Sequence, residues 1–160
     1  MPMVRDLLVG RNNPAVASIS PESSVLEAAR IMNDRHIGAV VVTQTERIVG
    51  IFTERDVLRR VVAQQLDPAQ TRVGDVMTSP VVGCTLTTPR AECESVMRQR
   101  HIRHLPVVDG ERVVGMVSVH DLLADEVHEQ ERTIHYLYEY MYGEWPGPQQ
   151  LSSYAPTGSV

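Results

Sequence analysis

The chain has 160 residues, carries a net charge of −5, and is 42% apolar and 22% charged. This size suits one ordinary domain or two small ones that share a core, and the composition is that of a globular protein. The sequence has no basic block, which argues against nucleic acid as the main partner. No apolar stretch approaches the roughly 20 residues that span a bilayer, and the first ten residues lack a signal-peptide core. We therefore expect a cytoplasmic protein without a membrane contact.

The first run of predicted elements covers residues 15 to 65. A short apolar run, "AVASIS" (15–20), precedes an amphipathic helix that Ser24 and Glu27 open as a capping box. Two β-like runs follow, "AVVVT" (39–43) and "RIVGIFT" (47–53), joined by a short polar turn. A second helix over residues 54–65 closes the unit. The predicted order is β-α-β-β-α.

The second run of elements has the same order. It starts with "PVVGCT" (80–85) and a helix for which Thr88 is the expected N-cap, with Pro89 as the first helical residue. Two β-like runs, "HLPVV" and "RVVGMVS", flank the hairpin signal Asp109-Gly110. A helix is expected from about residue 119 onward.

The two units are copies of one another. Shifting the sequence by 65 positions aligns residues 20–60 with 85–125 without a gap, and 12 of these 41 pairs are identical, among them Gly50/Gly115 and Asp56/Asp121. The lead-ins "VRDLL" (4–8) and "VGDVM" (73–77) also match. Neither copy could bury a core alone, so the two should pack together. We expect an α+β (α/β-like) fold of tandem β-α-β-β-α repeats, over residues 4–66 and 73–128, packed as a pseudo-twofold pair.

The segment after the second copy is rich in aromatic residues. Ile134, Leu137, Tyr138 and Met141 follow a helical spacing, whereas the tyrosines from 136 to 142 also alternate as a strand would. We favour a helix over 129–145 that continues the preceding one. Its tyrosines, with the single Trp145, suggest a protein contact surface, and the alternative is a helix that folds back onto the core of its own chain. Residues 146–160 are a Gly/Pro/Ser-rich tail that we expect to be disordered.

The cysteines and histidines give no sign of a metal site or an enzyme. Cys84 and Cys93 are interpreted as reduced, partly buried thiols, because their spacing does not indicate metal ligation. His36 and His101 occupy equivalent positions at the end of the first helix of each copy, where a C-cap is favourable. Neither a nucleophile with a base nor a Gly-rich phosphate loop is recognisable. We expect no metal and no catalysis.

A hydroxyl lies three residues before an aspartate in both copies, Thr53 with Asp56 and Ser118 with Asp121. One interpretation is structural: each pair forms a capping box at the start of the second helix. The other is functional. A hydroxyl and free N–H groups at a helix N-terminus suit a phosphate, and a carboxylate can accept from the two hydroxyls of a ribose. The sequence alone leaves both interpretations open.

The whole pattern resembles the cystathionine-β-synthase (CBS) domain, which occurs as tandem pairs. The resemblance rests on "DVMTSPVV" (75–82), "HIGAVVV" (36–42), "HIRHLPVVD" (101–109) and the two segments "GIFTERD" and "GMVSVHD". It implies two clefts that bind adenosine nucleotides, and dimers of pairs. Because the chain ends about 35 residues after the second copy, we expect no attached catalytic domain and a protein of the stand-alone bacterial type.

The resemblance also implies roles for residues. Asp56 and Asp121 would hold the ribose diol, with Thr53 or Ser118 on ribose or phosphate oxygens. The adenine would lie against segments from both copies. The candidate ligand-binding residues of both copies, including the neighbours of the two hydroxyl residues, are Ile37, Gly38, Ala39, Thr53, Arg55, Asp56, Ile102, Arg103, His104, Ser118, His120 and Asp121.

The two clefts should differ, because Arg103 and His104 stand where the first copy has Gly38 and Ala39. A guanidinium can meet phosphate with a planar fork of donors. The resulting expectation is a non-enzymatic regulatory sensor of AMP, ADP, ATP or another adenosine-containing nucleotide, without a required cofactor. It would form a homodimer and act on an unidentified target protein. The alternative is a ligand-free interaction scaffold in which the two motifs are only helix caps.

Overall fold

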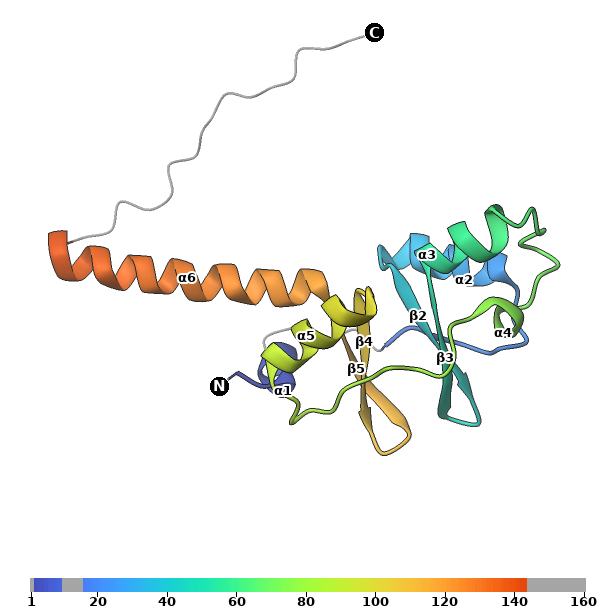
Figure 1. Ribbon diagram of the computed structural model, residues 1–160, viewed down its shortest axis with the longest axis horizontal. Coiled ribbons are helices and arrows are strands. Elements are labelled where there is room, and N and C mark those ends of the chain that lie inside the picture. Colours follow the sequence, from blue (N-terminus) through green and yellow to red (C-terminus); the bar gives the residue numbers. More distant parts are fainter. Residues whose placement is uncertain (1, 10–15, 144–160) are drawn as a thin grey trace, which may run out of the picture. The chain divides into compact units, whose positions relative to one another are not determined.

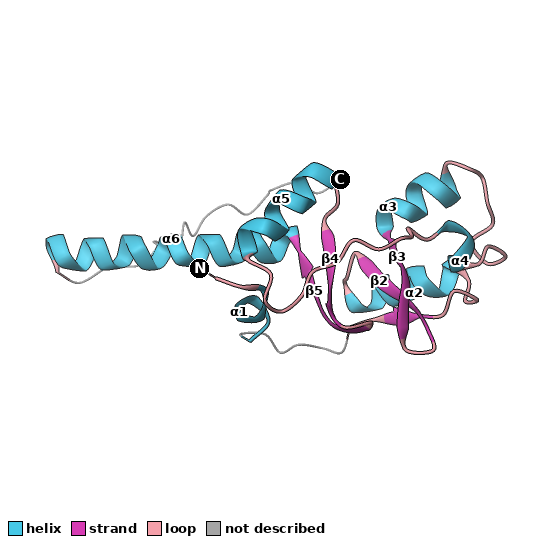
Figure 2. Cartoon of the chain, turned by 60° about the horizontal axis from the view of Figure 1, so that its bottom comes forward, coloured by secondary structure: helices cyan, strands magenta, loops and turns pink. Residues whose placement is uncertain are grey.

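The computed structural model describes residues 2–9 and 16–143. The chain forms two compact units, Met1–Leu123 and Ala124–Val160. The first unit contains both repeats up to Leu123, and the strands of the two repeats lie side by side within it (Figures 1 and 2). The first repeat has the predicted β-α-β-β-α order, and the second has it without the first strand. The predicted α+β pair of repeats is therefore confirmed.

The first repeat folds around a three-stranded sheet of order β1-β2-β3. β1 is parallel to β2, and β2 is antiparallel to β3. The elements in chain order are α1 (Val4–Val9), β1 (Ser18–Ile19), α2 (Val25–Arg35), β2 (Ala39–Gln44), β3 (Arg47–Thr53) and α3 (Glu54–Asp56), followed by the π-helix η1 (Val57–Val62). The π-helix corrects the prediction of one α-helix over 54–65. It is closed by i→i+5 hydrogen bonds, such as the 2.9 Å bond from the Ala63 N–H to the Leu58 carbonyl.

The second repeat has a two-stranded sheet, β4 paired with β5. Its elements are α4 (Val73–Val76), α5 (Arg90–Arg100), β4 (His104–Asp109), β5 (Arg112–Ser118) and α6 (Val119–Tyr142). The strand predicted at 80–85 does not form. Cys84 alone bridges to Val107, through one bond to the Pro106 carbonyl and one from the Val108 N–H.

The predicted helix ends are mostly correct. Ser24 and Glu27 form the capping box of α2, and His36 and His101 end α2 and α5 in the left-handed conformation, with φ of 52° and 53°. The predicted Thr88 cap is wrong by one residue. Pro89 occupies the N-cap of α5, because the Thr88 hydroxyl instead accepts from the Thr85 N–H at 2.9 Å.

The lead-in helices pack on the opposite repeats. Val4 and Leu7 of α1 belong to the core of the second repeat, with Leu105 and Val117, and the Val4 N–H donates to the Thr88 carbonyl at 2.9 Å. On the other side, Val73 and Val76 of α4 complete the core of the first repeat, with Phe52 and Val25. Each hydrophobic core is thus built from both halves of the sequence.

This exchange explains one identical glycine pair. A Cβ on Gly50 of β3 would overlap the sulfur of Met77 and lie 3.2 Å from the Thr78 carbonyl oxygen. A Cβ on Gly115 of β5 would lie 2.8 Å from Cδ1 of Leu8. Both glycines therefore lie beneath the segment that the other repeat contributes, which leaves little space for a side chain and least at Gly50.

Both cysteines are free and more deeply buried than expected, since Cys84 is 7% exposed and Cys93 1%. Both lie in the core of the second repeat, where the two thiols interact. This interaction raises the pKa of the Cys84 thiol, as does burial, and lowers the pKa of the Cys93 thiol.

The second unit contains the continuation of α6 to Tyr142. The aromatic segment is therefore helical, as favoured, and the alternating-strand reading is wrong. The rings of Tyr138 and Tyr142, one turn apart, lie 5.1 Å from each other. Trp145 and the predicted tail over 146–160 lie outside the described residues. No helix of the described ranges combines the length and the apolar composition that crossing a membrane requires.

Candidate functional site

The N-terminus of α3 is organised by Thr53 and Asp56. A carboxylate oxygen of Asp56 accepts from the Thr53 N–H at 3.0 Å and from its hydroxyl at 3.2 Å. The Thr53 hydroxyl in turn accepts from the Asp56 N–H at 3.3 Å. The capping-box interpretation is therefore confirmed here, and it fixes the carboxylate at the end of β3.

Two further groups reach the same carboxylate. The Thr78 hydroxyl donates to it at 3.1 Å, and the Arg60 side chain approaches to 3.5 Å from one helical turn further on. Thr78 comes from the segment after α4, which pairs with Ile51 of β3 through two backbone hydrogen bonds of 2.8 and 3.0 Å. Asp56 is 7% exposed and is the one buried charged residue of the described ranges.

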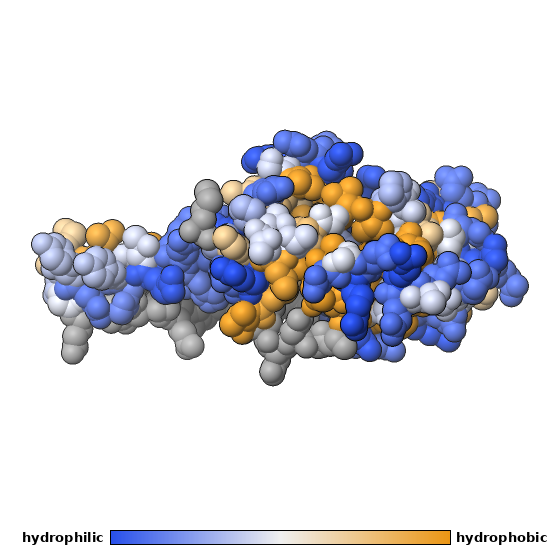
Figure 3. Space-filling view, turned by 90° about the horizontal axis from the view of Figure 1, so that it is seen from below, coloured by the Kyte–Doolittle hydropathy of each residue, from blue (hydrophilic) through white to orange (hydrophobic). Residues whose placement is uncertain are grey.

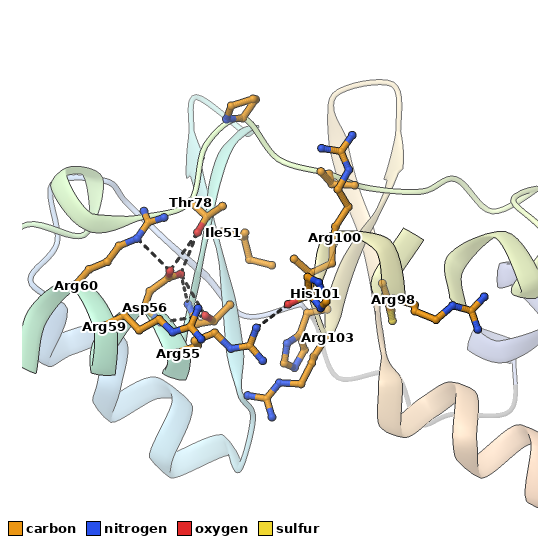
Figure 4. Close-up of a pocket in the computed structure, with 16 residues that line it drawn as sticks. Ile51, Arg55, Asp56, Arg59, Arg60, Thr78, Arg98, Arg100, His101 and Arg103 are labelled. Atoms are coloured by element: carbon orange, nitrogen blue, oxygen red, sulfur yellow. Dashed lines mark hydrogen bonds and ion pairs between the residues drawn. The ribbon is translucent and has the colours of Figure 1, made fainter. Parts of the chain in front are cut away.

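Asp56 lies on the wall of a cavity of about 850 Å³, here named the Asp56 cavity. Its lining comes from both repeats: Ile51, Thr53, Arg55, Asp56, Arg59, Arg60, Thr78, Pro80, Val82, Met97, Arg98, Arg100, His101, Ile102, Arg103 and His104. In Figure 4, Arg55 extends from the first repeat toward His101 of the second, and its guanidinium donates to the His101 carbonyl at 2.6 Å. This volume is in the range of small-molecule binding sites.

The Asp56 cavity is strongly basic. Six guanidinium groups line it, against the single carboxylate of Asp56. The sequence contains no lysine, so all 15 of its basic side chains are arginines. Arg60 is held by Asp56 and by the Met77 carbonyl at 2.6 Å. Within residues 2–9 and 16–143, no hydrogen-bond or ion-pair partner is found for four of the arginine side chains, all of them exposed: Arg59, Arg98, Arg100 and Arg103.

A second cavity, of about 650 Å³, lies around Ser118 and is here named the Ser118 cavity. It is lined by Met32, Asn33, His36, Ile37, Gly38, Glu54, Arg103, His104, Ser118, Val119, His120 and Leu123. Its charged groups are one guanidinium, Arg103, and one carboxylate, Glu54. Its charge is therefore close to balanced.

Ser118 and Asp121 form the equivalent of the first capping pair. The Ser118 N–H donates to the Asp121 carboxylate at 2.7 Å, and the Ser118 hydroxyl accepts from the Asp121 N–H at 3.2 Å. Asp121 is partly exposed, unlike Asp56. The residue of the first lead-in that matches Thr78 is Val9, which has no hydroxyl to offer.

The structure distributes the sequence-predicted residues between the two cavities in a crossed way. Thr53, Arg55 and Asp56 share a cavity with Ile102 of the other repeat, and Ser118 and His120 share one with Ile37 and Gly38. Arg103 and His104 line both cavities. Ala39 is buried in β2, and neither Ala39 nor Asp121 is part of either lining.

His104 is the candidate residue with a perturbed pKa. Burial lowers the pKa of its imidazole, and the neighbouring Arg103 lowers it further. Asp121 and Glu54 act in the opposite direction without reversing the shift. A neutral imidazole at this place can donate and accept hydrogen bonds without adding to the positive charge of Arg103.

Sequence reasoning missed several lining residues, chiefly Thr78, Arg59, Arg60, Arg98 and Arg100. The contact of Arg60 with Asp56 could have been predicted, because an arginine four residues after an aspartate on a helix favours an ion pair. Thr78 lay inside the quoted segment "DVMTSPVV", but its contact with Asp56 depends on the exchanged lead-ins. The other three arginines carried no sequence signal.

Two repeats of a helix, a β-hairpin and a second helix, with exchanged lead-ins and with cavities built from both, define a CBS domain pair. The chain belongs to the CBS domain family, whose sequence profile matches residues 4–63 and 73–127.

Individual members of this family are similar over most of the chain. The mitochondrial CBS domain-containing protein CBSX3 of Arabidopsis thaliana is 32% identical over 127 residues, which is 76% of this chain and 62% of that protein. The chain thus spans less than two thirds of that relative's length. The CBS-domain containing protein ATU1752 of Agrobacterium tumefaciens has a solved structure with a TM-score of 0.73 and 33% identity, covering 78% of this chain and 99% of that one. The CBS domain protein PAE2072 of Pyrobaculum aerophilum, solved in complex with AMP, has a TM-score of 0.70 and 28% identity, covering 83% and 99%.

Proposed function

We propose that this chain is a regulatory module that binds an adenine nucleotide between its two CBS repeats and acts through contacts with another protein, without catalysis. One observation carries the proposal: the Asp56 carboxylate, fixed by Thr53, lies in a cavity with six guanidinium groups. A carboxylate suits ribose hydroxyls, and guanidinium groups suit phosphate. A relative of the same fold was solved with AMP, which supports this choice of ligand.

The proposed binding mode uses both repeats. Asp56 and Thr53 would hold the ribose, Ile51 and Ile102 would enclose the adenine with apolar surface, and the arginines would face the phosphate. The Ser118 cavity would bind a second nucleotide through Ser118, His120 and Gly38. Each nucleotide would then contact residues of both repeats, so that binding stabilises the pair as a unit.

Thermal unfolding with adenosine, AMP, ADP, ATP and GTP tests this proposal. An adenine nucleotide at a hundred times its Kd should stabilise the fold by about 2.7 kcal/mol, a shift of several degrees in Tm. The matched variant Asp56→Asn keeps the shape of the side chain but removes its charge. We expect it to weaken adenine-nucleotide binding about 10-fold or more. If the Tm is the same with and without each of these nucleotides, the proposal is refuted.

The structure also favours a second candidate function, a ligand-free interaction scaffold. The Asp56 carboxylate already accepts hydrogen bonds from Thr53 and Thr78, so its acceptor capacity is partly used within the protein. Under this alternative the motif serves only as a helix cap. The thermal panel separates the two candidates, because a scaffold would show no selective shift with an adenine nucleotide.

The proposal includes a homodimer. Leu58 and Leu123, at equivalent positions of the two repeats, are 62% and 54% exposed, and Val62 is 60% exposed. Hydrophobic residues also gather over the middle of the face drawn in Figure 3. Exposed apolar surface of this kind commonly marks a protein contact. Light scattering at micromolar concentration should give twice the chain mass of 17.8 kDa, and a monomer would contradict this part of the proposal.

A further inference from the structure

We infer that the Asp56 cavity selects its nucleotide by the length of the phosphate chain, preferring a triphosphate to a monophosphate, and that Arg59 and Arg103 bind the added phosphates. This inference rests on the proposed function, since it names the ligand class of the same cavity. The inference also goes beyond the proposed function, because the Ser118 cavity should show no preference for a triphosphate over a monophosphate.

The arginines of the Asp56 cavity divide into two groups by their partners. Arg55 and Arg60 are held within the protein, the first by the His101 carbonyl and the second by the Met77 carbonyl and Asp56. They shape the cavity and cannot turn freely to a ligand. Arg59, Arg98, Arg100 and Arg103 have no such partner within the described residues. In Figure 4 the side chains of Arg98 and Arg100 point away from Asp56, whereas Arg59 and Arg103 lie near Arg55 and come from different repeats.

The positions of these two arginines suit an extended anion. Arg59 lies on the π-helix that follows Asp56, whereas Arg103 immediately precedes β4 of the second repeat (Figure 4). A single phosphate beside the ribose can meet few of these groups. A longer chain carries more charge and more acceptor oxygens, and it can reach from the α3–η1 side to Arg103.

Charge balance favours the same conclusion. Six guanidinium groups remain charged at any pH at which the protein is folded, because arginine does not deprotonate in proteins. With one carboxylate as counter-charge, they repel one another across the cavity. Each further phosphate relieves that repulsion. The Ser118 cavity has one guanidinium and one carboxylate, so added phosphate brings no comparable gain there.

Calorimetric titration of the full chain with AMP and with ATP, without added magnesium, tests the inference. We expect ATP to bind the Asp56 cavity at least about 10-fold more tightly than AMP at low salt, with the difference shrinking as salt screens the charges. Arg59→Ala should reduce the affinity for ATP about 5- to 10-fold and that for AMP less than 2-fold. Arg59 lines only the Asp56 cavity, so its loss does not disturb the other site.

Arg30→Ala is the matched control, because Arg30 is an exposed residue of α2 outside both cavities. It should leave both affinities unchanged, and its Tm and that of Arg59→Ala should equal the wild type. Equal loss of ATP and AMP affinity in Arg59→Ala, or no loss, would overturn the inference.

Titration with inorganic tripolyphosphate separates this inference from the proposed function. If the wild type binds tripolyphosphate and Arg59→Ala binds it less, the arginines form a polyphosphate site whether or not a nucleotide binds. Failure of every nucleotide to bind, with tripolyphosphate still bound, would refute the adenine assignment alone. If neither ATP nor tripolyphosphate binds, the inference is wrong.

Discussion

Asp56 and Asp121 occupy the same position in two copies of one motif and have different surroundings. Asp56 is buried beneath the Thr78 hydroxyl and beside Arg60, whereas Asp121 is partly exposed and Val9 takes the place that matches Thr78. One cavity holds six guanidinium groups and the other holds one. The comparison teaches that duplication preserves the cap, which the fold needs in both places, while the residues around it diverge and give the two cavities different charge.

The largest contrast in stability should come from the two aspartates. Asp56→Ala removes the acceptor for Thr53 and Thr78, and hydrogen bonds to a charged group contribute about 1.5–3 kcal/mol each. We expect a loss of about 2–3 kcal/mol in the free energy of unfolding, measured in urea. Asp121→Ala should cost about 1 kcal/mol, the value of a lost cap. Equal losses would show that the surroundings of the two caps do not matter.

The glycine pair should give the next largest contrast. In Gly50→Ala, the new methyl group meets Met77 and also the backbone carbonyl of Thr78, which cannot rotate away. We expect a loss of about 1–2 kcal/mol from overpacking. In Gly115→Ala the methyl meets only the flexible tip of Leu8, so the loss should stay below about 1 kcal/mol. Urea denaturation of both variants measures the difference, and a larger loss for Gly115→Ala would contradict the packing described.

Thr78→Val should make the first site more like the second. The substitution keeps the shape of the side chain and removes the hydroxyl that donates to Asp56. We expect a loss of about 1 kcal/mol in unfolding free energy. Thr78→Ser retains the hydroxyl and is the control, which should lose less. If the two variants are equally stable, the Thr78–Asp56 bond contributes nothing measurable.

The smallest effect concerns pH and His104, which stands where the first repeat has Ala39. The folded state lowers the pKa of His104, through burial first and Arg103 second. As pH falls below about 6.5, the unfolded chain therefore takes up the proton before the folded chain does. Stability is full above that pH and declines below it. The decline between pH 7.5 and pH 5.5, measured in urea, should be smaller in His104→Asn than in the wild type. An identical decline would show that His104 does not contribute.

Much of this architecture follows from local signals in the sequence. The repeat predicted the pair of β-α-β-β-α units, and the apolar runs at 39–43 and 47–53 predicted β2 and β3. The Ser24 capping box and the ends of α2 and α5 at His36 and His101 were also predictable, because caps depend on residues a few positions apart.

The features that escaped prediction depend on contacts between the two halves. Each lead-in helix directly precedes its own repeat in the sequence, and nothing in its residues indicates that it packs on the other repeat. The contact of Thr78 with Asp56 could therefore not be inferred. For the same reason, Arg103 was expected to distinguish the second cleft, whereas it lines both cavities. The π-helix after Asp56 had no sequence signal, because its residues read as an ordinary amphipathic helix.

The Asp56 cavity has arginines and no lysine among its lining residues, which has a practical chemical consequence. A lysine-free sequence offers no ε-amine to acetyl transfer, to ubiquitin attachment or to amine-reactive dyes. The charge of the cavity therefore cannot be switched off by lysine acetylation, which in other proteins removes a positive charge. Reagents directed at ε-amines therefore leave every side chain that lines the cavity unmodified.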